Sequence, residues 1–182
     1  MTASLRYRPP QAWLHWLSAI LVFAGIALGL TMVDLPLSPQ KLRWYSWHKW
    51  LGLTVFLFTL LRVGLRLGFQ APAPIAMPAW QRRAATVTHV LLYLFLLAIP
   101  VSGWLYSSAS GVSVVYLGLL PLPDLVGPDK ALAESLRLVH KTLNYTMFFL
   151  LAGHIAGAVK HQLVDRDSLI ARMALWSSRK ET

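Results

Sequence analysis

The stretch PPQAWLHWLSAILVFAGIALGLTMV, residues 9–33, decides the fold class because it contains no charged side chain. At about 1.5 Å of rise per residue, a helix of this length crosses the roughly 30 Å hydrocarbon core of a bilayer. Trp13 and Trp16 lie near its start, where tryptophans gather at the membrane–water interface. We predict a retained membrane-spanning helix over about residues 11–33. The alternative is a cleaved signal peptide, but the run is longer than a signal-peptide core and lacks a clear small-x-small cleavage site.

The whole chain has the composition of a membrane protein. Its 182 residues are 56% hydrophobic and 13% charged, whereas a soluble domain carries about 25% charged residues. The net charge of +10 comes from Lys and Arg that flank apolar segments, rather than from a basic face with interleaved aromatics, which argues against nucleic-acid binding. Because there is no Cys, disulfides, thiolate-bound iron–sulfur clusters and Cys-attached haem are excluded, and His is the obvious metal ligand.

Three further spans are predicted, over about residues 43–67, 84–106 and 132–163. The second is short in strictly uncharged residues, but Arg62 and Arg66 can extend along it to the interface. The apolar segment 111–123 is too short and too rich in Gly and Pro for a fifth span, and suits an interfacial or re-entrant position. We therefore predict one domain over residues 1–182, an all-α, integral membrane four-helix bundle with up-down topology.

The distribution of Lys and Arg predicts the orientation of this bundle. The N-terminus, the second loop and the C-terminal tail carry more of them than the first and third loops. Because positively charged segments remain on the cytoplasmic side, both termini are predicted to be cytoplasmic.

Six histidines lie in or at the ends of the predicted spans: His15, His48, His89, His140, His154 and His161. A histidine within a membrane is costly to place and points to function. His48 and His140 lie near the outer ends of their helices, and His154 follows His140 by about 21 Å of rise on the same helix face. His15 lies at a similar depth to His154. Each of two layers thus supplies two imidazoles from two helices, which suits the two axial positions of a haem iron.

Residues around the histidines allow more than one interpretation. Gly25, Gly29, Gly52, Gly153 and Gly157 would give a macrocycle room between the helices, although glycines also permit close helix packing. Lys49 and Lys141 each follow an outer histidine. Their ammonium groups can pair with haem propionates or attract an anion to the outer side, and contact with lipid phosphate is the equal alternative.

A histidine-based metal transporter is a further alternative. The apolar cores of the four spans contain no Asp or Glu, although ion-coupled transporters use such groups as relays and zinc sites use them to orient their ligands. The sequence therefore favours electron transfer over transport.

Taken together, these residues resemble the bacterial cytochrome b561 family of small di-haem membrane proteins. The matching motifs are Trp13-Leu14-His15-Trp16, His48-Lys49-Trp50-Leu51-Gly52, the segments His89 to Tyr93 and Ile99 to Trp104, His140-Lys141-Thr142-Leu143, and Gly153-His154 with His161 beyond. The resemblance covers nearly the whole chain.

The resemblance implies two haem b groups per chain, with His15 and His154 as axial ligands of the inner haem iron and His48 and His140 as those of the outer one. It also implies a multi-pass protein of the bacterial inner membrane and quinone chemistry. One activity in the family is the oxidation of superoxide, or of another one-electron donor, with electrons passed to ubiquinone.

Under this resemblance His161 is the first candidate to contact the quinone, followed by Lys160 and His89. A histidine that only caps its helix is the competing interpretation, and it is the favoured one for His89. The longer cytochrome b subunits of hydrogenases and formate dehydrogenases share the histidine arrangement and anchor soluble partners. An electron-transfer subunit serving such a partner oxidoreductase is therefore the alternative, although the short outer loops favour a stand-alone protein.

Overall fold

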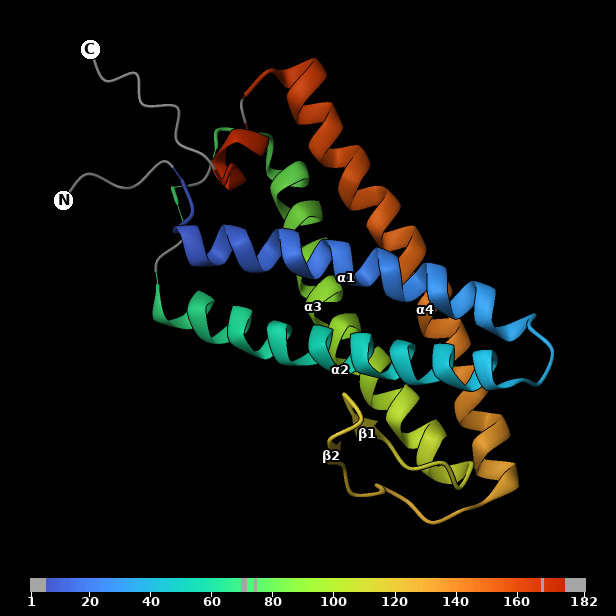
Figure 1. Cartoon of the computed structure of the whole chain (residues 1–182). Helices are drawn as coiled ribbons and strands as arrows, with labels where there is room; N and C mark the ends of the chain where they lie inside the picture. The colour runs from blue at the N-terminus through green and yellow to red at the C-terminus, as the bar shows by residue number, and fades with distance from the viewer. Residues whose placement is uncertain (1–5, 70–71, 74, 168, 176–182) are drawn as a thin grey trace.

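Four long helices form the computed structural model, which describes residues 6–69, 72–73, 75–167 and 169–175. They are α1 (Pro9–Val33), α2 (Pro39–Gly68), α3 (Ala79–Ala109) and α4 (Lys130–Lys160) (Figure 1). All four are long and apolar enough to cross a membrane. The predicted all-α membrane four-helix bundle is therefore confirmed, while the side of the membrane that each terminus faces stays a prediction.

The helices are arranged as two antiparallel hairpins, α1 with α2 and α3 with α4 (Figure 1). Packing of α2 on α3 joins the hairpins, and contacts between α1 and α4 are sparse. The two ends of the described chain meet at one end of the bundle, where the Tyr7 amide donates to the Arg172 carbonyl at 3.1 Å and the Trp16 indole to the Met173 carbonyl at 2.8 Å. Because the number of spans is even, both ends of the described chain lie at the same end of the bundle.

Large apolar side chains cover the outward faces of the helices. Phe23, Leu30 and Phe149 are 49%, 56% and 73% exposed, which would be costly in water but is expected where lipid is the solvent. The bundle therefore has a small packed core, and its stability depends on the bilayer around it.

Local capping explains why α2 and α4 begin a few residues before the expected positions. The Ser38 side chain accepts a hydrogen bond from the Lys41 amide, and Pro39 occupies the first turn of α2, where its missing N–H and fixed φ are favourable. The Asp129 side chain accepts from the Leu132 amide in the same way at α4. Both caps extend the helices beyond their apolar cores.

The segment between α3 and α4 forms a small antiparallel hairpin, β1 (Val115–Tyr116) and β2 (Leu120–Pro121), instead of a fifth span. It packs against α2 and α3. The Trp50 indole donates to the Val115 carbonyl at 2.7 Å, and the Trp104 indole to the Pro123 carbonyl at 3.1 Å. The hairpin thereby covers the end of the bundle opposite the chain termini, which is the predicted outer end.

The fourth helix changes form where it ends. After Lys160 it continues as one π-helical turn, η1 (His161–Asp165), and a short 3-10 helix, η2 (Ile170–Met173), follows. Between them Arg166 adopts a left-handed conformation with φ of 54°. The chain reverses there and returns toward η1.

Candidate functional site

The outer histidines face each other across the gap between the hairpins. His48 of α2 and His140 of α4 have ring centres 6.2 Å apart and ring planes at 86°. His48 Nδ1 lies 3.0 Å from the Gly25 carbonyl oxygen. His140 Nδ1 lies 3.1 Å from the Ile99 carbonyl oxygen and 2.9 Å from the Ser102 hydroxyl, which itself donates to that carbonyl at 2.7 Å. A carbonyl oxygen only accepts hydrogen bonds, so both Nδ1 atoms carry the proton and both Nε2 atoms keep a lone pair. This is the tautomer that ligates a metal through Nε2.

Two glycines from the remaining helices make space behind these rings. A Cβ added to Gly29 of α1 would lie 3.0 Å from His48 Cε1, and one added to Gly103 of α3 would lie 3.0 Å from His140 Cε1. Either contact would displace the ring. The helices that carry no outer histidine therefore position both outer histidines, through a carbonyl and a glycine each.

A cavity of about 590 Å³ lies beside the outer pair, within the usual range for a bound organic ligand. Both histidines line it, together with Tyr45, Phe56, Trp104, Asn144 and Met147. Its wall is mostly apolar, as a macrocycle requires.

The two lysines that follow the outer histidines are not equivalent. Lys49 lines the cavity, and its ammonium lies 3.5 Å from the Val112 carbonyl oxygen. Lys141 is exposed, and its ammonium lies 5.9 Å from the centre of the Tyr145 ring on the same helix. Of these two lysines, Lys49 is the one that lines the cavity.

The inner histidines meet at the other depth of the bundle. His15 of α1 and His154 of α4 have ring centres 6.3 Å apart and planes at 67°. A third ring, His89 of α3, lies 5.3 Å from that of His154. Arg62 of α2 donates to His15 Nδ1 at 3.2 Å and also stacks over Tyr93, 5.3 Å from the ring centre. A cationic side chain thus stands beside the inner pair.

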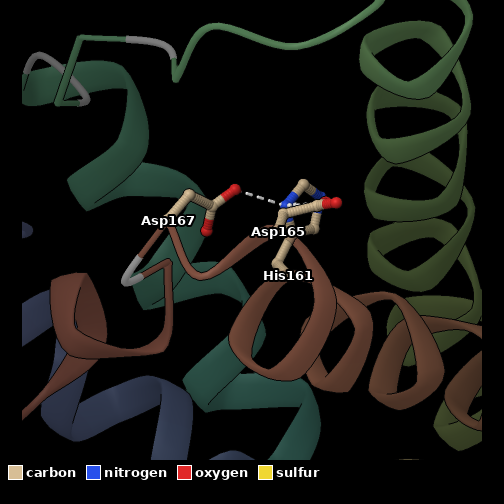
Figure 2. Close-up of side chains that lie close together, drawn as sticks. All are labelled: His161, Asp165 and Asp167. Atoms are coloured by element: carbon tan, nitrogen blue, oxygen red, sulfur yellow. Dashed lines mark hydrogen bonds and ion pairs between the residues drawn. The ribbon is translucent and has the colours of Figure 1, made fainter.

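His161 lies beyond the inner pair, in η1, and is held by two carboxylates (Figure 2). Its Nδ1 is 2.5 Å from Asp167 Oδ2 and 3.1 Å from Asp165 Oδ2. Lys160 pairs with Asp165 at 2.7 Å. Sequence reasoning selected His161 and Lys160 but missed both aspartates, because Asp167 reaches His161 only through the reversal at Arg166.

The ligand atoms of His161, Asp165 and Asp167 lie within 4.8 Å of one another, a spacing that can hold a metal ion. However, the imidazole already donates to the carboxylates, and Lys160 supplies a positive charge to Asp165. These groups satisfy one another without a cation, so we interpret the cluster as a hydrogen-bonded network.

Four apolar spans with paired histidines at two depths define a class of protein, the helical-bundle membrane cytochromes. A model of the family described as prokaryotic cytochrome b561 matches residues 6–175. The chain therefore belongs to the prokaryotic cytochrome b561 family, and it is a bacterial membrane protein of electron transfer for which the family implies b-type haem.

Curated relatives match over similar lengths. The chain is 34% identical to cytochrome b561 homolog 2 of Escherichia coli (strain K12) over 173 residues, which cover 92% of this chain and 90% of the relative. It is 28% identical to cytochrome b561 homolog 1 of the same organism, over 92% of this chain and 96% of that protein. It is 24% identical to a protein of Yersinia pestis named probable superoxide oxidase CybB, over 92% and 95%.

The ring separations of both histidine pairs fit a haem iron, although on the inner side the Arg62 guanidinium donates to His15 Nδ1 and would have to release it. With roughly 2 Å from a metal to each imidazole nitrogen and roughly 1 Å from that nitrogen to the ring centre, two rings on opposite sides of one iron have centres about 6 Å apart. The observed separations are 6.2 and 6.3 Å. The pairing of His48 with His140 and of His15 with His154 is therefore compatible with axial ligation, and the ligand roles themselves stay a prediction.

Proposed function

We propose that the chain binds two b-type haems and moves single electrons between the outer face of the membrane and the quinone pool. His48 and His140 would hold one haem, and His15 and His154 the other. The observation that carries this proposal is the meeting of two imidazole pairs at two depths, with ring separations suited to one iron each. When bound, the haems would supply one-electron carriers.

Superoxide is the proposed donor on the outer side. Lys49 supports this proposal, because it lines the outer cavity and its positive charge would attract an anion to it. The name of the Yersinia pestis relative, probable superoxide oxidase, supports the same chemistry. Superoxide would give up one electron on this side and leave as dioxygen, and the haem held by His48 and His140 would supply the one-electron acceptor.

Ubiquinone is the proposed acceptor on the inner side, which we place at the cytoplasmic face of the bacterial inner membrane. His161 is the proposed contact to the quinone because it lies about 10 Å of helix rise beyond His154 and is 13% exposed. Lys160 is already paired with Asp165, and His89 already contacts His154. We therefore propose Lys160 and His89 only as secondary contacts to the quinone.

The test is a haem-to-protein ratio combined with superoxide-driven reduction of a soluble ubiquinone analogue by the purified chain. Two haems per chain and quinone reduction that superoxide dismutase abolishes are expected. A sample without Soret absorbance would contradict the proposal. A haem-loaded chain that reduces quinone only after a partner dehydrogenase or hydrogenase is added would instead identify an electron-transfer subunit.

The lysines offer a matched pair for the superoxide step. Lys49→Gln is expected to slow superoxide-driven haem reduction several-fold at low ionic strength, with the effect fading as salt is added. Lys141→Gln removes the same charge from an exposed position and is expected to have a smaller effect. Equal rates in the two variants would show that the cavity position of Lys49 is irrelevant.

A further inference from the structure

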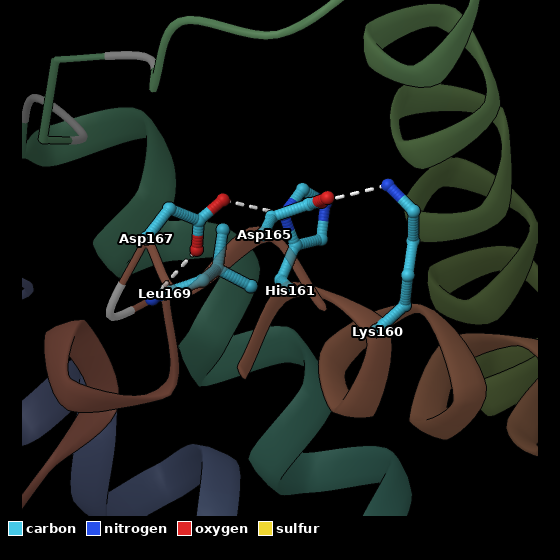
Figure 3. Close-up of polar contacts among 5 residues, drawn as sticks. All are labelled: Lys160, His161, Asp165, Asp167 and Leu169. Atoms are coloured by element: carbon cyan, nitrogen blue, oxygen red, sulfur yellow. Dashed lines mark hydrogen bonds and ion pairs between the residues drawn. The ribbon is translucent and has the colours of Figure 1, made fainter. Parts of the chain in front are cut away.

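The end of α4 departs from regular helix at the residues that surround His161. The π-helical turn spans His161–Asp165, and Arg166 takes a left-handed conformation with φ of 54°. A non-glycine residue adopts this conformation only at a cost, and isolated π turns are frequent at functional sites. The result is that Asp167 returns onto His161 (Figure 3).

Asp167 is the better placed of the two carboxylates around His161 Nδ1. Its Oδ2 lies 2.5 Å from Nδ1, and its Oδ1 accepts a hydrogen bond from the Leu169 amide at 3.1 Å. Both oxygens of Asp167 are thus fixed. Asp165 is further away, at 3.1 Å, and shares the same oxygen with the Lys160 ammonium. The orientation of the imidazole therefore depends mainly on Asp167.

The contact determines what the other ring nitrogen can do. A carboxylate only accepts hydrogen bonds, so Nδ1 keeps its proton and Nε2 is left to exchange one. In hydrolase triads an aspartate on Nδ1 likewise holds the imidazole in place while Nε2 transfers the proton. When Nε2 carries a proton it is a donor, which is what a quinone carbonyl oxygen needs during reduction.

We propose that Asp167 is a positioning residue that holds His161 Nδ1, so that His161 Nε2 donates protons to a bound quinone. The inference rests on the quinone function proposed above. One quinone takes up two electrons and two protons to become a quinol. The two electrons reach it one at a time, on the side of the membrane where His161 lies. At the outer face two superoxide anions lose one electron each and leave as two dioxygen molecules. Each proton leaves Nε2 for a quinone oxygen, and Nε2 then takes up another from cytoplasmic water.

The test is anaerobic stopped-flow mixing of the reduced, haem-loaded chain with a soluble ubiquinone analogue, following haem oxidation in the visible spectrum. Asp167→Asn is expected to lower the limiting rate about 100-fold, the usual contribution of a positioned acid, with little change in the quinone concentration for half-maximal rate. Haem content and haem reduction by superoxide should match wild type. Asp167→Glu, which keeps the carboxylate, should retain more of the rate than Asp167→Asn.

Two further variants separate positioning from general effects. Asp165→Asn should slow oxidation less than Asp167→Asn, because Lys160 already shares that carboxylate. His161→Gln should be as slow as the double variant His161→Gln with Asp167→Asn, since a residue that acts only through His161 has nothing to add once the imidazole is gone. Glu134→Gln, near the opposite end of α4, is the control for loss of a carboxylate.

The outcomes distinguish this inference from the proposed function. Failure of quinone to oxidise the wild-type haems would reject the function itself. A wild-type protein that reacts, together with an unchanged Asp167→Asn rate, would reject only the role of Asp167. Additive effects in the double variant, loss of haem from Asp167→Asn, or a Glu variant slower than the Asn variant would also overturn the proposal.

Discussion

The outer and inner histidine pairs have nearly equal ring separations, 6.2 and 6.3 Å, but different surroundings. The outer rings donate from Nδ1 to neutral oxygens, the Gly25 carbonyl for His48 and the Ile99 carbonyl and Ser102 hydroxyl for His140. On the inner side, His15 Nδ1 meets the Arg62 guanidinium, and His154 stands beside His89. The same pairing is thus supported by neutral oxygens at one depth and by cationic or ionisable side chains at the other.

The difference has two physical consequences. A carbonyl on Nδ1 makes an imidazole a more basic ligand and favours oxidised iron, whereas a nearby cation favours the reduced state. The inner site should therefore have the higher reduction potential, and electrons should run downhill from the outer to the inner side. In addition, Arg62 donates to His15 Nδ1, which places the proton of a neutral His15 on Nε2. Arg62 has to release Nδ1 before Nε2 can ligate.

The largest expected effect breaks one pair and leaves the other. His140→Ala should lose the outer haem and halve the haem-to-protein ratio, because a single remaining imidazole cannot supply both axial ligands. His154→Ala should do the same to the inner haem. Pyridine haemochrome analysis against protein concentration measures the ratio. Retention of two haems in either variant would count against the assigned ligands.

A smaller effect tests the space behind an outer ring. Gly103→Ala would place a Cβ 3.0 Å from His140 Cε1, so the ring must shift away from its carbonyl partner. We expect roughly tenfold weaker binding of the outer haem, the lower end of effects seen when ligand orientation is disturbed. Gly64→Ala, whose Cβ meets nothing within 4 Å, is the matched control. Equal haem titrations for the two variants would refute a positioning role for Gly103.

The smallest expected effect tests whether the positive charge of Arg62 distinguishes the inner site from the outer one. Arg62→Gln removes the cation beside His15 and should lower the inner reduction potential by tens of millivolts, the size of one charge acting in partly buried surroundings. Arg62→Lys keeps the charge and should largely preserve the potential. Spectroelectrochemical titration resolves the two haems. An unchanged inner potential, or an equal shift at both haems, would remove Arg62 as the source of the asymmetry.

Much of the architecture was accessible to local reasoning. The four spans follow from apolar runs that a helix of known rise must carry across the bilayer, and the structure has helices at all four. The grouping of His48 with His140 and of His15 with His154 follows from the depth of each histidine along its own helix. The helix starts at Pro39 and Lys130 depended on the caps Ser38 and Asp129, which an apolar pattern does not detect.

The sequence by itself determined the depth of each histidine, because the rise along a helix depends only on residue number. Only the tertiary structure decided which groups surround each ring: the Gly25 and Ile99 carbonyls, the Arg62 guanidinium and the Asp167 carboxylate. These contacts depend on how each helix is rotated against its neighbours and on where the chain turns back. The rotation of each helix and the position of the turn are set by packing between segments far apart in the chain. A local pattern of residues therefore does not predict them.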